Sequence, residues 1–164
     1  MRITLEHLKN ILSERILIID GAMGTMIQRY KLSETDFRGE IFKDHKKDLQ
    51  GNNDLLSLSQ PEIIKNIHRE YFKAGADIVE TNTFNAQQVS LADYHMEALA
   101  YEINFAAAQI AKKATAYYNL KDPSKPRFVA GALGPMNKTL SLSPDVNNPG
   151  FRGLLWDDAV AAYY

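Results

Sequence analysis

The chain has 164 residues, 45% of them hydrophobic and 24% charged, which is ordinary for a globular domain with a sizeable core. Its 19 lysine and arginine residues and 20 aspartate and glutamate residues give a formal net charge of −1, which argues against a nucleic-acid partner. The absence of cysteine excludes disulfides, thiol nucleophiles and thiolate zinc sites within this sequence.

The N-terminal part of the chain is predicted to form a helix and then a buried strand. Residues 1–6 lack the apolar stretch of a signal peptide, and no apolar run reaches the ~18 residues of a membrane span, so we expect a cytoplasmic protein. A short polar helix is predicted over residues 5–13. Residues 16–19 are continuously apolar, which is typical of a strand buried on both faces in a parallel sheet, and Asp20 and Gly21 end it.

A turn, a long connection and a second helix are predicted next. Residues 24–30 are expected to form a short helical turn, and residues 31–56 a long polar connection. The helix is predicted to begin at Ser59, because Ser59 and Glu62 have the spacing of a capping box. Gly75 supplies its C-terminal stop.

Strands and helices then alternate to the end of the chain. A second buried strand is predicted over residues 77–81 and a long helix, with an apolar stripe at helical spacing, over about residues 89–118. A third strand over residues 128–133 is followed by a polar loop over 137–153 and a last helix over 155–164. This order predicts an α/β fold with a parallel sheet and right-handed crossovers. Three strands are fewer than the eight of a closed barrel of this kind.

Each predicted strand ends in small or polar residues, and in a parallel sheet these ends share the edge where binding sites form. Asp20 is the sharpest candidate, because a carboxylate that follows an apolar strand needs a cationic or hydrogen-bonding partner. It either holds a ligand group such as a substrate ammonium or caps the following turn, and spacing alone leaves both explanations open. Gly21 leaves backbone N–H groups open to an anion, although a tight turn is the commoner explanation. Glu80, Thr81 and Asn82 end the second strand, where Thr81 also fits plain β structure.

The histidines and the basic cluster do not indicate a further site. The four histidines fit no metal-ligand spacing, and His68 is expected to be an exposed residue of the helix that begins at Ser59. The basic run at residues 43–47 has acidic residues within and beside it and is predicted to be a solvated loop. We therefore assign no catalytic residue and no metal ligand in this chain.

Several ungapped blocks of the sequence resemble one known family over essentially the whole chain. The blocks are residues 14–28, 35–40, 51–56, 74–85, 103–108, 129–135 and 143–147. In this order they resemble the homocysteine-binding (homocysteine S-methyltransferase) domain of cobalamin-dependent methionine synthases, in its N-terminal part only. Long blocks in the right order are far more specific than any single motif above.

This resemblance implies a fold and a reaction. The family's domain is a (β/α)8 TIM barrel, so the chain is expected to form about its first three βα units. Homocysteine binds at the C-terminal ends of the strands with its thiolate on zinc, and the thiolate takes a methyl group from methylcobalamin, which 5-methyltetrahydrofolate recharges. Carried over by position, Asp20 would hold the substrate ammonium and Gly21 would line the amino-acid pocket. Thr81 would lie beside them, with Glu80 and Asn82 adjacent.

The chain departs from the family at the metal. The family's three zinc ligands are cysteines on later strands, so neither zinc nor cobalamin is expected on this cysteine-free chain alone. We expect residues 1–164 to be a truncated N-terminal part of the barrel domain, inactive by itself, with the remaining barrel half and the cobalamin and folate modules as its partners. The alternative is a non-catalytic partial barrel that binds an amino acid or self-associates. A nucleotide-binding α/β protein is a third hypothesis.

Overall fold

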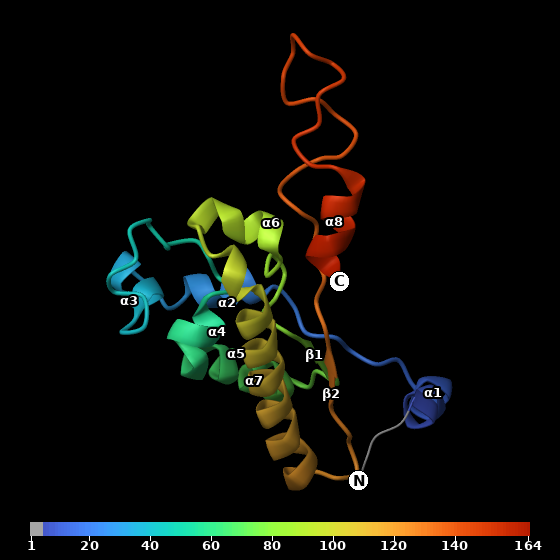
Figure 1. The fold of residues 1–164 in the computed structure, drawn as a ribbon. Helices are drawn as coiled ribbons and strands as arrows, with labels where there is room; N and C mark the ends of the chain where they lie inside the picture. Colours follow the sequence, from blue (N-terminus) through green and yellow to red (C-terminus); the bar gives the residue numbers. More distant parts are fainter. Residues whose placement is uncertain (1–4) are drawn as a thin grey trace.

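The computed structural model describes residues 5–164, which form a mixed α/β structure around a small parallel sheet (Figure 1). Strand β1 (Ile78–Glu80) pairs in parallel with β2 (Phe128–Ala130), and Val79 lies opposite Val129. Both strands were predicted, although each is shorter than its predicted range, residues 77–81 and 128–133. Residues 1–4, which enter the argument about a signal peptide, lie outside the described residues.

The first predicted strand is reduced to one parallel bridge between Ile19 and Ile78. The Ile18 oxygen accepts hydrogen bonds from the N–H groups of Asp77 and Ile78, at 2.7 and 3.1 Å. The Ile18 N–H, however, donates to the Asp77 carboxylate at 3.0 Å and not to strand backbone, which limits the ladder. Three βα units are therefore not confirmed. Burial on both faces is wrong for this segment, because Ile16 and Ile18 are 86% and 60% exposed.

Helices make up most of the ordered structure. In chain order they are α1 (Leu5–Glu14), α2 (Met23–Gln28), α3 (Glu34–Arg38), α4 (Leu56–Ser59), α5 (Pro61–Ala74), α6 (Gln88–Leu91), the 3-10 helices η1 (Ala92–Tyr94) and η2 (Glu97–Leu99), α7 (Ala100–Lys121) and α8 (Trp156–Tyr163). Helices α5 and α7 pack against each other and against the strands. Figure 1 shows α1 standing apart from this body, and the segment that leads to α8 projecting away from it.

Helix α5 confirms the predicted C-terminal stop and corrects the predicted start. Gly75 ends it in the left-handed region, at φ 112°, where glycine carries no steric cost. The helix begins at Pro61 rather than Ser59. Gln60 is its N-cap residue, and its side chain makes no capping hydrogen bond, so the capping box predicted from Ser59 and Glu62 is absent from the described structure. The Gln60 amide donates instead to the Asp36 backbone oxygen, at 2.8 Å.

The region predicted as a long polar connection, residues 31–56, contributes to the core. It contains α3, and the leucines at 49, 55 and 56 are fully buried. The carboxylate of Glu34 accepts the N–H group of Leu49 at 2.9 Å, which fastens the loop to α3 and places that leucine in the core. The prediction was wrong because buried leucines separated by polar residues show no helical or strand period.

The predicted long helix over residues 89–118 is interrupted before α7. Helix α6 and the two 3-10 helices precede α7, and His95 takes a left-handed backbone conformation, at φ 55°. Met96 follows it and is buried, so the break turns an apolar side chain inward. None of the helices among residues 5–164 is long and apolar enough to cross a bilayer.

Candidate functional site

A cavity of about 580 Å³ opens at the carboxyl ends of the strand segments. All five residues proposed from the sequence line it, namely Asp20, Gly21, Glu80, Thr81 and Asn82. The structure thus brings together the two strand ends that the sequence placed at one edge.

Asp20 points its carboxylate at the neighbouring strand. Its Oδ1 atom accepts the backbone N–H of Glu80 at 3.1 Å, and its own N–H donates to the Ile78 oxygen at 2.9 Å. Burial raises the pKa of Asp20 to about 6, an effect that the Glu80 N–H opposes and the Glu80 charge reinforces. The alternative role as a helix cap does not hold, because Ala22 is the N-cap of α2 and no described side chain caps that helix.

Asp54 is a further carboxylate of this cavity, more deeply buried than Asp20, that the sequence argument missed. It is 4% exposed, and its Oδ1 atom accepts the Asn85 N–H at 3.3 Å. Burial raises its pKa to about 6 as well. The only sequence signal was its position in the Gly-Asn-Asn-Asp block within the supposed polar connection, where a carboxylate looks like an ordinary loop residue.

Thr81 joins the ends of the two strands through its hydroxyl group. The Ala132 N–H donates to Thr81 Oγ1 at 3.0 Å, and Thr83 Oγ1 donates to the Ala132 oxygen at 2.8 Å. The two hydroxyl oxygens lie 2.7 Å apart, so the Thr81 hydroxyl has Thr83 as its acceptor. This chain of hydrogen bonds fixes one wall of the cavity.

Asn82 braces a second part of the cavity wall. Its amide donates to the Asn53 oxygen at 2.8 Å and to Ser57 Oγ at 3.3 Å, which ties the end of β1 to the segment that leads into α4. Asn82 is buried, whereas Glu80 is exposed towards the opening. The five proposed residues therefore divide into two carboxylates, one glycine and two side chains that brace the walls.

A close contact between loops holds the rim of the cavity. A Cβ atom added to Gly134 would lie 2.2 Å from the Phe84 backbone oxygen and 2.7 Å from its ring. The Gly134 oxygen also accepts the Tyr163 hydroxyl at 2.6 Å. Only glycine fits here, and it lets the segment after β2 lie against the residue that lines the cavity after β1.

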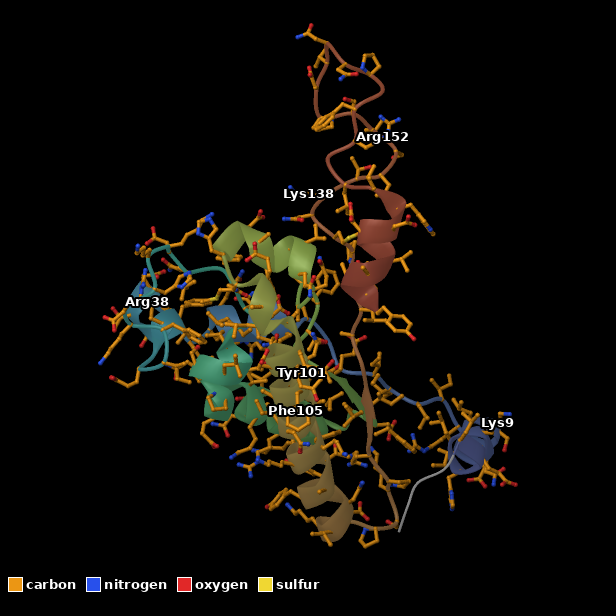
Figure 2. All side chains as sticks on the ribbon, viewed as in Figure 1. Lys9, Arg38, Tyr101, Phe105, Lys138 and Arg152 are labelled. Atoms are coloured by element: carbon orange, nitrogen blue, oxygen red, sulfur yellow. The ribbon has the colours of Figure 1, made fainter. Side chains whose placement is uncertain are left out.

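The cavity is negatively charged. Asp20, Asp54 and Glu80 line it, and no lysine, arginine or histidine does so within the described part of the chain. The basic side chains labelled in Figure 2 lie elsewhere: Lys9 in α1, Arg38 in α3, and Lys138 and Arg152 in the segment between β2 and α8. Such a cavity attracts a cation such as an ammonium group and repels phosphate, which disfavours the nucleotide-binding hypothesis.

The chain does not fit a structural or catalytic zinc ion. It has no cysteine, and residues 5–164 contain no cluster of three metal-ligating His, Cys, Asp or Glu side chains. His68 lies alone in the interior, fully buried, which overturns its predicted exposure. Both of its ring nitrogens lack a hydrogen-bond partner in the described structure.

Known proteins of one family resemble this chain. The structure is similar to the homocysteine methyltransferase MmuM from Escherichia coli: in its metallated form the TM-score is 0.61 at 23% identity, over 78% of this chain and 41% of that one. The oxidized form gives 0.61 at 24% identity, over 78% and 40%. This likeness concerns the fold, and the chain spans about 40% of the length of that enzyme. The sequence profile of the homocysteine S-methyltransferases matches residues 17–164, so the chain belongs to the homocysteine S-methyltransferase family.

Proposed function

We propose that this chain supplies the amino-acid-binding part of a homocysteine S-methyltransferase. Asp20 holds the ammonium group of homocysteine, assisted by the charge of Glu80. The observation that carries the proposal is the pair of strand-end carboxylates in a cavity that no basic side chain of the described residues enters. A partly buried carboxylate with a raised pKa, such as Asp20, gains from a bound cation, because the ion pair offsets its desolvation.

The other proposed residues shape the pocket around the substrate. Gly21 gives the substrate access to the backbone at the start of α2, where a side chain would approach the Tyr71 hydroxyl at 3.3 Å. Thr81 and Asn82 act through the walls they brace, since the Thr81 hydroxyl and the Asn82 amide nitrogen already bond to neighbouring segments. Under this proposal Thr81 and Asn82 are positioning residues.

Thiol activation and the methyl donor belong, in this proposal, to parts of a longer protein. The chain covers 41% of the E. coli enzyme and offers no set of zinc ligands within its described residues. We propose that these 164 residues form the N-terminal part of a (β/α)8 barrel in a cobalamin-dependent methionine synthase. The sequence blocks that resemble that enzyme support this choice, as they do a methylcobalamin donor recharged by 5-methyltetrahydrofolate. The chain alone is then inactive in methyl transfer.

Calorimetric titration of the chain with L-homocysteine, under reducing conditions at neutral pH, tests the binding step. Asp20→Asn is expected to weaken binding by about tenfold or more, because a hydrogen bond to a charged group contributes about 1.5–3 kcal/mol. Asp44→Asn is the matched control: it removes the same charge from an exposed loop position outside the cavity. Equal affinity of Asp20→Asn and the unchanged chain contradicts the proposal.

Self-association is the second candidate function, and one surface favours it. Trp156, Val160 and Tyr163 of α8 line an almost wholly apolar hollow of about 420 Å³, and Trp156 is 70% exposed. Exposed apolar patches of this kind mark interaction sites. A mass measurement by light scattering decides it: a concentration-dependent dimer together with undetectable homocysteine binding favours this function over the first.

A further inference from the structure

A second, smaller hollow adjoins the central cavity and is lined by polar and apolar groups in similar measure. Its volume is about 130 Å³, room for a few water-sized groups. Gly51, Asp54 and Asn85 line both spaces, so the two share a wall. Asp93 and Tyr94 of η1 also line it.

Asn52 lines this hollow and has an unused hydrogen-bond donor. The residue is 3% exposed, and its Oδ1 atom accepts the Leu55 N–H at 3.3 Å. Its Nδ2 atom is buried and has no acceptor anywhere in residues 5–164. A buried donor left in this state costs about 1–3 kcal/mol, so an acceptor on a bound group would be strongly favoured.

Two carboxylates give the same hollow a negative charge. Asp54 is buried in its wall, and Asp93 Oδ2 accepts the Asn137 amide at 2.5 Å. Both charges act on Tyr94, whose pKa is raised first by burial and then by Asp93 and Asp54. In the described structure no lysine, arginine or histidine lines the hollow. A bound group must therefore bring a positive charge as well as a hydrogen-bond acceptor.

We propose that this hollow binds the head group of a free α-amino acid, separately from the site at Asp20. Its ammonium lies towards Asp54 and Asp93, and its carboxylate accepts the Asn52 Nδ2–H and the Tyr94 hydroxyl. A zwitterion satisfies both requirements at once, whereas a simple cation leaves the Asn52 donor unused and a simple anion faces two carboxylates. Because the shared wall contains Asp54, occupation of the hollow acts on the electrostatics of the central cavity.

Glycine is the probe, since it is little more than a head group. The titration is followed by amide NMR in the Asp20→Asn variant, in which the central site is weakened. Glycine binding in the hollow is thus measured separately from homocysteine binding at Asp20, and either proposal can fail without the other. Glycine is expected to shift the amide signals of Gly51 and Asn85 saturably. Methylamine and acetate, each carrying half of the head group, are expected to leave them unchanged at the same concentrations. No shift with glycine means that the hollow holds water only, and an equal shift with methylamine means a plain cation site. Either result overturns the proposal.

Variants of the lining residues give the second readout. Asn52→Ala and Tyr94→Phe are each expected to weaken glycine binding about tenfold or more, because each removes a hydrogen bond to the carboxylate. If Asn52→Ala fails to fold, Asp93→Asn serves instead, since Asp93 lies at an exposed position of η1. This variant removes the contact to the ammonium group and is likewise expected to weaken glycine binding. Asp44→Asn is again the charge-matched control and is expected to bind glycine unchanged. Unchanged affinity in both Tyr94→Phe and Asp93→Asn contradicts the assignment.

Discussion

Replacing His68 by leucine removes an ionisable group from the interior of α5. The side chain is fully buried, and both ring nitrogens lack partners in residues 5–164. Burial lowers its pKa from 6.5 to about 4, because the charged imidazolium is poorly solvated there. The folded state therefore requires the neutral ring, and the unfolded chain binds the extra proton below pH 6.5.

The sign of the effect on stability follows from this lowered pKa. The contribution of neutral His68 is fully present above pH 6.5 and is lost as the pH falls towards 4. The difference corresponds to about 3 kcal/mol of unfolding free energy in all, of which about 2 kcal/mol is lost between pH 7 and pH 5. Asp20 and Asp54 oppose it, because their raised folded pKa values make protonation stabilising in the same range. The difference in stability between His68→Leu and the unchanged chain therefore isolates the contribution of the histidine, because both proteins contain Asp20 and Asp54.

Urea unfolding followed by circular dichroism at pH 7 and pH 5 makes this comparison. His68→Leu is expected to be more stable than the unchanged chain at pH 7, since two buried unpaired nitrogens are removed, and its advantage is expected to grow by about 2 kcal/mol at pH 5. His95→Asn is the control, because His95 is exposed and asparagine tolerates its left-handed backbone. The reasoning fails if the difference between His68→Leu and the unchanged chain is the same at both pH values.

Three further predictions concern the cavity and its supports. Gly134→Ala is expected to lower the unfolding free energy by about 2 kcal/mol or more, because the added methyl group meets the Phe84 backbone at 2.2 Å; an unchanged urea midpoint contradicts this. Asp77→Asn weakens the bidentate pair with Arg15, two contacts of 2.8 Å, which holds the pKa of Asp77 at about 2. Because Arg15 is 40% exposed, we expect a loss of only about 1 kcal/mol, measured by unfolding at pH 7 and shrinking as the pH falls from 3.8 towards 2. Homocysteine affinity is expected to fall about tenfold from pH 7 to pH 5 as Asp20 protonates near pH 6, and a flat calorimetric profile argues against its role.

Surface aromatic residues show how little exposure alone says about function. Tyr101 and Phe105 lie one helical turn apart on the outer face of α7, with ring centroids 6.0 Å apart and nearly parallel (Figure 2). Their spacing along the chain already places them on one face of a helix. The described structure gives no partner that covers them, and we assign them no role.

Local patterns in the sequence determined the elements whose ends are set by neighbouring residues. Short apolar stretches marked β1 and β2, and Gly75 marked the end of α5, because strand propensity and left-handed glycine geometry act over a few residues. The parallel order of the strands also placed Asp20 and Glu80 at one edge. In the structure the Glu80 backbone N–H donates to Asp20 Oδ1 at 3.1 Å. The five proposed site residues followed from these strand ends, and the family was indicated by the resemblance of longer sequence blocks.

Only the tertiary structure decided which polar residues became buried. The Ile18 N–H donates to the Asp77 carboxylate and not to a backbone oxygen of a neighbouring strand. The first predicted strand is therefore reduced to a single bridge. His68 was buried by packing, although its sequence neighbours are charged, and Asp54 entered the cavity wall because its loop folds inward on buried leucines. Burial depends on contacts between segments far apart in the chain, such as the pair Arg15 and Asp77, which are separated by 62 positions. The local periodicity of a sequence carries no information on such contacts.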